Sequence, residues 1–285
     1  MSNNLQAHLA AVAAEQTPLW INGWRYGEKL LRKGNSPWGE VAPLVSFFNQ
    51  LQSLLKSDVL TIDLESFYEN WLKSHPSLLS EMGAKNRLGY ALRTLLADQQ
   101  ARSHLKEIVS AICEVHKNTP VLISFPSPRR WLGTAHCDAK QVQQVEVSWQ
   151  EAESGAMYLA DFFREFSSCG LSGIVLREEN GEAPCSNEEV AHYQPLINVA
   201  KHYGWSVVLD GCADDFQPSP EVGVTLCLGS ANENVQGRKL APSYWTGSCS
   251  ADKDLADNQF WFVDIPADAV PEQVLDVLAT LREKS

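Results

Sequence analysis

Two aspartates at the ends of short apolar segments carry side chains that could transfer protons. Asp63 ends the segment VLTID, and Asp210 ends the segment SVVLD. A positioned carboxylate can take up or deliver a proton during a reaction, or accept hydrogen bonds from the N–H groups of a ligand. For Asp63 the alternative role is a helix cap, because a helical pattern starts directly after it. We predict that Asp63 and Asp210 are catalytic residues.

A pair of neighbouring arginines predicts an anion-binding site. Arg129 and Arg130 follow the segment Pro126-Ser127-Pro128, which places both in a loop stiffened by proline. Two guanidinium groups side by side can bind a carboxylate or a phosphate through paired hydrogen bonds. We predict that they bind substrate. The alternative is an ion pair between one of them and a surface acid.

Three charged residues, Arg177, Glu178 and Glu179, end another apolar segment. Side chains alternate along a strand, so Arg177 and Glu179 would share one face and Glu178 would point the other way. We predict that Arg177 and Glu179 bind substrate, and a glutamate whose pKa is raised by burial could act as a general acid or base. An Arg–Glu ion pair at the rim of the fold is the alternative.

Eight short apolar segments organise the chain around these residues. They occupy residues 18–22, 59–63, 121–126, 173–179, 206–211, 222–230, 243–248 and 260–264. Eight such strands, several separated by helical stretches, predict an α/β fold: a single (β/α)8 TIM barrel with its active site at the carboxyl ends of the strands. A doubly wound open sheet is the alternative for the first five strands.

Helical periodicity fills several of the connections between the apolar segments. It covers residues 43–56, 65–117, 150–169, 187–203 and 271–283. The longest of these stretches, 65–117, predicts a helical insertion and crossover after the second strand. We expect one domain over residues 1–285, with residues 1–16 as an N-terminal extension.

Polar segments late in the chain predict irregular loops between strands five and eight. They are residues 212–221, 230–242 and 250–258, rich in Pro, Ser, Asp and Asn. The triplet His136-Cys137-Asp138 is predicted to lie in the loop after the third strand, where it is a weak signal of a metal site. His192, Tyr193 and His202 are interpreted as structural residues of a helix.

Composition limits the partners that the chain is expected to have. The formal net charge of −12 disfavours binding to nucleic acid or to an anionic membrane surface. Seven cysteines without a CxxC pair indicate reduced thiols and a cytoplasmic protein. The expected partner is a small anionic substrate, no cofactor is expected, and a homodimer is the oligomeric state that we consider.

Several segments in order resemble uroporphyrinogen decarboxylase-like proteins. The tail FWFVDIPADAVPEQVLDVLATLR is similar to the last strand and closing helix of that family, and TPLWINGWRYGEKL is similar to its N-terminal run, with Arg25 and Tyr26 in the Arg-Tyr element. SDVLTIDL resembles the strand that carries an essential aspartate, which maps to Asp63. VVLDGCADD lies where the related cobalamin-independent methionine synthases place a zinc pair.

The resemblance implies a lyase, a carboxy-lyase that acts without a cofactor on a carboxylated, aromatic or polycyclic small molecule. Arg25, Tyr26 and the arginine pair would bind this substrate, while Asp63 and Asp210 would handle the proton. The first alternative is zinc-dependent methyl transfer through Asp210, Cys212 and Cys249. The second is a non-catalytic barrel that binds a ligand or a partner protein.

Overall fold

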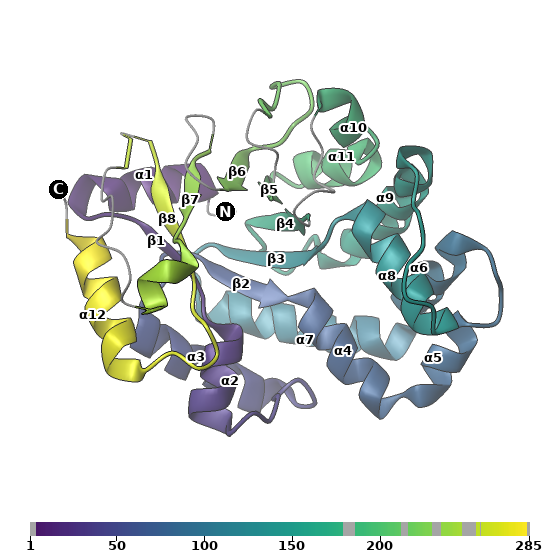
Figure 1. The fold of residues 1–285 in the computed structure, drawn as a ribbon, viewed down its shortest axis with the longest axis horizontal. Coiled ribbons are helices and arrows are strands. Elements are labelled where there is room, and N and C mark those ends of the chain that lie inside the picture. Colours follow the sequence, from purple (N-terminus) through teal and green to yellow (C-terminus); the bar gives the residue numbers. More distant parts are fainter. Residues whose placement is uncertain are drawn as a thin grey trace.

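Eight parallel strands form a nearly closed α/β barrel, the predicted (β/α)8 TIM barrel (Figure 1). The computed structural model describes residues 4–178, 186–211, 216–229, 235–246, 255–256 and 258–283. The strands are β1 (Leu19–Asn22), β2 (Leu60–Asp63), β3 (Val121–Pro126), β4 (Gly173–Arg177), β5 (Ser206–Asp210), β6 (Leu226–Gly229), β7 (Gly237–Lys239) and β8 (Phe260–Asp264). Hydrogen-bonded neighbours follow the order β1-β8-β7-β6-β5-β4-β3-β2.

The barrel closes between β1 and β2 through side chains as well as through the backbone. A single parallel bridge joins Trp20 to Val59. The backbone N–H of Leu19 donates to Asp58 Oδ2 at 2.7 Å, and that of Ile21 donates to Ser57 Oγ at 2.9 Å. These two side chains satisfy strand N–H groups that a complete ladder would pair with carbonyls.

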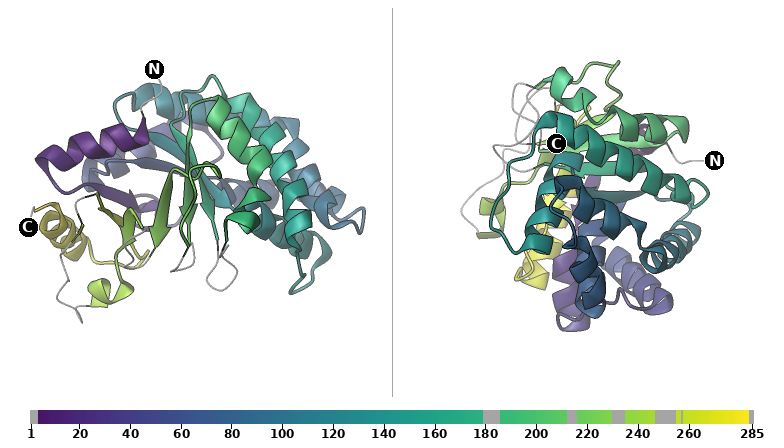
Figure 2. Two further views of the ribbon diagram at one scale, coloured as in Figure 1. Left: turned by 90° about the horizontal axis from the view of Figure 1, so that it is seen from above. Right: turned by 90° about the vertical axis from the view of Figure 1, so that its right-hand side faces the viewer.

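Helices surround the sheet as the connections between strands (Figures 1 and 2). They are α1 (Leu5–Glu15), α2 (Trp24–Arg32), α3 (Val41–Leu55), α4 (Leu64–Ser74), α5 (Pro76–Met82), α6 (Leu88–Ala97), α7 (Gln99–Val115), α8 (Pro128–Lys140), α9 (Trp149–Phe163), α10 (Asn187–Ala191), α11 (Gln194–His202) and α12 (Pro271–Arg282). Four of them, α4 to α7, lie between β2 and β3. Within the described residues, the only helix between β5 and β8 is a 3-10 turn at Pro242–Thr246.

Helix α1 covers the amino-terminal end of the barrel. Its Leu5 and Leu9 are buried in one apolar cluster with inward-facing strand residues such as Trp20, Val175 and Val208. In the left view of Figure 2 this helix crosses the ends of the strands on the side opposite to the loops that follow them. The barrel interior is therefore packed with apolar side chains and covered by α1 at its amino-terminal end, so the carboxyl end is the open end of the barrel.

The seventh strand differs from its prediction. Residues 243–248 were expected to form it, but Pro242–Thr246 is a 3-10 turn and β7 is Gly237–Lys239. This strand has few apolar residues because its neighbours accommodate polar ones. The Arg238 guanidinium lies over the Trp261 ring at 5.2 Å, and Lys239 pairs with Asp210. A Cβ at Gly237 would lie 2.2 Å from a methyl of Leu228, so glycine allows the close approach.

The segment after β3 is also helical where a loop was predicted. Ser127 caps α8, its Oγ accepts the N–H of Arg130, and Pro128 occupies the first turn. Proline suits that position because it lacks an N–H that would remain unpaired there. Arg129 and Arg130 thus lie in the first turn of α8, and His136-Cys137-Asp138 lies further along the same helix.

The described helices include none whose length and apolar character would allow it to cross a membrane.

Replacing Leu5 by Ala is expected to lower the free energy of unfolding by about 2–5 kcal/mol, because it leaves a cavity at the closed end of the barrel. Urea denaturation followed by tryptophan fluorescence measures the change. The matched control is Leu275→Ala on α12, where the side chain is 46% exposed, and its cost should stay within about 0.5 kcal/mol. Equal costs for the two variants would contradict the role of α1 as a buried cover.

Candidate functional site

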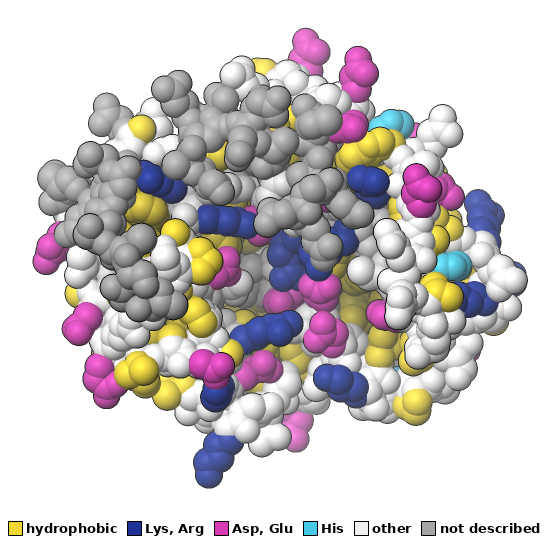
Figure 3. Space-filling model, viewed as in Figure 1, with side chains coloured by type: hydrophobic (Ala, Val, Ile, Leu, Met, Phe, Trp, Pro, Cys, Tyr) yellow, Lys and Arg dark blue, Asp and Glu magenta, His cyan; other side chains and the backbone are white. Residues whose placement is uncertain are grey.

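Six polar side chains form a ring at the carboxyl ends of the strands, which we call the mouth ring. Each lies two or four positions beyond an inward-facing residue of its strand, so strand alternation turns it inward as well. The ring consists of Asn22, Asp63, Arg177, Asp210, Lys239 and Asp264. Figure 3 looks onto this end of the molecule, where Lys, Arg, Asp and Glu side chains gather around a central hollow.

Arg177 connects the acids on one side of the mouth ring. Its Nη2 lies 3.0 Å from Asp63 Oδ1 and 2.7 Å from Glu65 Oε2, and its Nη1 donates to Asp63 Oδ2 at 3.3 Å. Burial alone would lower the pKa of Arg177, but the negative charges of Asp63 and Glu65 raise it overall. The guanidinium is thus held charged, and it offsets two carboxylates in a partly buried position.

Asp63 has the capping role that the sequence offered as the alternative, and it also takes part in an ion pair at the mouth. Its carboxylate caps α4 by accepting the N–H groups of Glu65 at 3.1 Å and Ser66 at 3.4 Å. It also accepts the Ser66 hydroxyl at 3.0 Å and pairs with Arg177. With its oxygens shared among a helix terminus and a guanidinium, Asp63 is well fixed in position.

A second set of polar and charged side chains lies at the ends of β1, β5, β7 and β8. Lys239 pairs with Asp210, whose side chain is 12% exposed. Asn22 donates to Asp264 Oδ1 at 2.7 Å. Partial removal from water raises the pKa of Asp264, the bond from Asn22 lowers it, and the negative charge of Asp210 raises it further, with an upward shift overall.

Glu178 lies at the rim next to the mouth ring, in a polar cluster that we call the rim cluster. Its carboxylate accepts the Ser127 hydroxyl at 2.8 Å and the Tyr193 hydroxyl at 2.7 Å. Burial raises the pKa of Glu178 to about 7, although both hydrogen bonds and the charges of Arg129 and Arg130 lower it. Tyr193, interpreted from the sequence as structural, is therefore a partner of a titratable group.

The predicted arginines and Tyr26 occupy four different surroundings. Arg130 reaches Glu65 at 3.8 Å and so joins the Arg177 network, whereas Arg129 donates to the Val147 carbonyl at 2.9 Å and lies over Trp149. Arg25 is exposed on α2 beside the mouth. Tyr26 is buried in the apolar cluster under α12, away from the ring. Glu179, Cys212 and Cys249 lie outside the described residues.

The structure thus brings Asp63, Arg177, Asp210 and Arg130 together at one end of the barrel, and it adds residues that the sequence did not nominate as site residues. Lys239 was missed because its strand was predicted elsewhere, and Asn22 because an amide is an inconspicuous signal. Asp264 was not nominated as a catalytic or substrate-binding residue. Its place at the end of the correctly predicted eighth strand was the signal that could have found it.

The described residues contain no group of three or more His, Cys, Asp or Glu side chains that could hold a metal ion. At Asp210, the proposed zinc ligand, the partner is the ammonium of Lys239. A cation already occupies the position in which a metal would neutralise this carboxylate.

Comparison with known proteins gave matches among solved structures only; no family model and no curated protein matches. One similar structure is a 2,3-dimethylmalate lyase, described as a member of the PEP mutase/isocitrate lyase superfamily. It is 7% identical to this chain. The match covers 96% of this chain and 85% of the lyase chain, with a TM-score of 0.41. Another is described as a phosphonomutase from Burkholderia cenocepacia J2315. It is 11% identical to this chain. The match covers 97% of this chain and 96% of that chain, and the TM-score is again 0.41.

The family inferred from the sequence is not borne out by these comparisons. The 2,3-dimethylmalate lyase is described as a member of the PEP mutase/isocitrate lyase superfamily, which is not that of uroporphyrinogen decarboxylase. No family model and no curated protein supports the uroporphyrinogen decarboxylase-like and methionine synthase-like resemblance. The cofactor-free decarboxylase activity, the zinc methyltransferase alternative and the non-catalytic alternative that accompanied it are not supported.

The raised pKa of Glu178 predicts how stability depends on pH. A carboxyl whose pKa is about 7 in the folded protein and about 4.3 in the unfolded chain binds its proton more tightly when folded. Its contribution to stability is therefore full below about pH 4 and is lost as the pH rises to about 7. The total loss is about 3–4 kcal/mol, at about 1.4 kcal/mol for each unit of difference in pKa.

Chemical denaturation at pH 5 and pH 8 measures this effect. The stability of Glu178→Gln relative to the parent protein should be greater at pH 8 than at pH 5, because Gln does not titrate. Glu146→Gln, at an exposed position, should show no such difference. If Glu178→Gln changes the free energy of unfolding by the same amount at pH 5 and at pH 8, the burial assigned to Glu178 is contradicted.

Proposed function

We propose that the chain is an enzyme that binds a small anionic molecule over the mouth ring and transfers a proton through Asp264. The observation that carries the proposal is the placement of the Asp264 carboxyl at the end of β8, next to the strand that presents the partly exposed ammonium of Lys239; the upward shift of the Asp264 pKa is consistent with it. A carboxyl with a raised pKa changes its protonation state nearer to neutral pH, which is what a general acid or base requires.

Lys239 is the cation of the ring that is best placed to receive an anion. Its side chain is 35% exposed, compared with 21% for Arg177. An ammonium carries three donors, so an anionic group can bind it while the ion pair with Asp210 remains. Arg177 is engaged by two carboxylates, which suits it for holding the ring together.

Asp264 faces the same opening with spare hydrogen-bonding capacity. Its carboxylate receives one hydrogen bond from a described residue, that of Asn22 on Oδ1, and its side chain is exposed. The apolar side chains directly beneath it, such as Phe262 and Phe260, keep water away from one side of the ring. A ligand that covered the other side would strengthen the electrostatic interactions at this carboxyl.

A panel of acetate, malonate, pyruvate and inorganic phosphate, titrated into isotope-labelled protein and followed by NMR, tests the binding step. Lys239→Met should weaken binding at least tenfold, and Lys239→Arg should restore part of it because the charge is kept. Lys201→Met on α11 is the control and should leave binding unchanged. If no member of the panel shifts the resonances of mouth residues, the anion site does not exist.

The catalytic step is tested with turnover of any substrate found among small carboxylates and phosphate esters. Asp264→Asn should lower kcat by about 10²–10⁴-fold with little change in ligand affinity, because Asn keeps the shape and the contact with Asn22. Unchanged turnover in this variant would show that Asp264 does not transfer the proton.

A further inference from the structure

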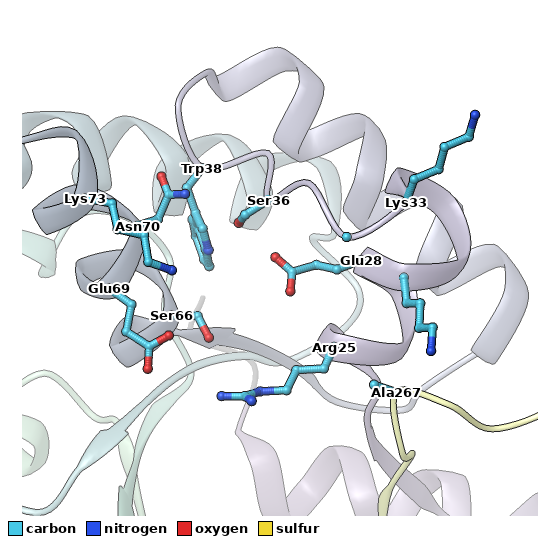
Figure 4. Close-up of a pocket in the computed structure, with 12 residues that line it drawn as sticks. Arg25, Glu28, Lys33, Ser36, Trp38, Ser66, Glu69, Asn70, Lys73 and Ala267 are labelled. Atoms are coloured by element: carbon cyan, nitrogen blue, oxygen red, sulfur yellow. The ribbon is translucent and has the colours of Figure 1, made fainter.

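A pocket of about 750 Å³ lies between α2 and α4. Helix α2 contributes Arg25 and Glu28 to it, helix α4 contributes Ser66, Glu69, Asn70 and Lys73, and the segment between α2 and α3 contributes Ser36 and Trp38. Figure 4 shows these side chains around a common hollow. The residues of α4 recur at intervals of three and four, so they form one face of that helix.

The pocket opens at the same end of the barrel as the mouth ring. Its residues come from the segments that follow β1, β2 and β8, and Ala267 lies three residues after Asp264. The two sites touch through Ser66, which lines the pocket and donates its hydroxyl to Asp63. In TIM barrels the loops after the strands supply the binding residues.

Charges of both signs line this pocket without pairing with one another. The side chains of Arg25, Lys73, Glu28 and Glu69 form no ion pair or hydrogen bond with any other described residue. The other two lysines that line the pocket, Lys29 and Lys33, do not offer a free ammonium group to a ligand in the hollow. Lys29 pairs with Asp268, and Lys33 extends away from the hollow in Figure 4.

Two unsatisfied polar atoms lie at the wall of the pocket. Trp38 is 2% exposed, stacks on Trp24 with ring centroids 4.5 Å apart, and has an indole N–H with no acceptor among the described residues. Ser36 Oγ is likewise buried and without a described partner. Buried donors in folded proteins are nearly always satisfied by protein, water or ligand. At Trp38 the missing partner must be an acceptor, since an indole N–H only donates.

We propose that this pocket binds a small zwitterion, a molecule of the amino-acid class. Its carboxylate is received by Arg25 and Lys73, and the Trp38 N–H donates to it; its ammonium is received by Glu28 and Glu69. A ligand with only a negative charge would pair with the two cations and leave the two carboxylates without a counter-charge. A ligand with only a positive charge would pair with the two carboxylates and leave the two cations without one. A molecule with both charges satisfies all four side chains. The proposal does not depend on proton transfer at Asp264.

The probes are chosen to separate one charge from two. L-norleucine and 6-aminohexanoate carry both charges at two separations, whereas hexanoate and hexylamine each carry one. Each is titrated into 15N-labelled protein while the indole N–H resonance of Trp38 is followed. At least one zwitterion should shift that resonance and bind at least tenfold more tightly than either single-charge analogue. Equal binding of hexanoate would make the pocket an anion site and overturn the proposal, and so would no shift with either zwitterion.

Two surface substitutions assign the contacts. Arg25→Met and Glu69→Gln should each weaken binding of the zwitterion at least tenfold, and both positions are exposed, so the fold tolerates them. Lys85→Met and Glu81→Gln, from a different surface hollow beside α5 and α6, are the matched controls and should have no effect. Asp264→Asn should also leave this binding unchanged, which separates failure of the pocket from failure of the catalytic proposal.

Discussion

The interaction on which the mouth of this barrel depends is the one between Arg177 and the carboxylates of Asp63 and Glu65. Three acids of the mouth ring stand directly above an apolar interior, with water excluded from below. Carboxylates in such a position repel one another and lose hydration, so they remain charged only if cations lie among them. Arg177 meets this need on the side of β2 and β4, and Lys239 meets it on the side of β5 and β7.

The ion pair between Arg177 and Asp63 also fixes the position of α4. Asp63 ends β2 and starts α4 at once, so the same carboxylate that binds Arg177 also fixes the helix that carries Ser66 and Lys73. The mouth ring and the pocket between α2 and α4 are thus attached to one anchored residue. Helix α1 covers the far end of the barrel through its buried Leu5 and Leu9. The result is a rigid apolar base beneath a ring of paired charges whose most exposed members are Lys239, Asn22 and Asp264.

Sequence reasoning predicted the barrel because strands such as 121–126 and 260–264 are mostly apolar runs, and their observed bounds agree. It failed at β7, which is three residues long and has Arg238 and Lys239 facing neighbours that no local pattern reveals. The contact between Asp63 and Arg177 could be expected, because both residues end predicted strands. The ion pair between Lys239 and Asp210 could not be expected, because the strand that carries Lys239 was predicted elsewhere. Tyr26 was nominated by family likeness, and packing against α12 decides its burial. The likeness itself rested on short segments, such as a strand, a short loop and a helix starting with proline, which do not define a family.

A double-mutant cycle tests the central interaction most directly. The free energy of unfolding is measured for the parent protein, Arg177→Met, Asp63→Asn and the double variant; Asn keeps the ability to cap α4. A direct, partly buried ion pair predicts that the two substitutions are non-additive by about 1–3 kcal/mol, with the double variant less destabilised than the sum. Additive effects would show that Arg177 and Asp63 do not interact in solution, and the compensated mouth described here would be wrong.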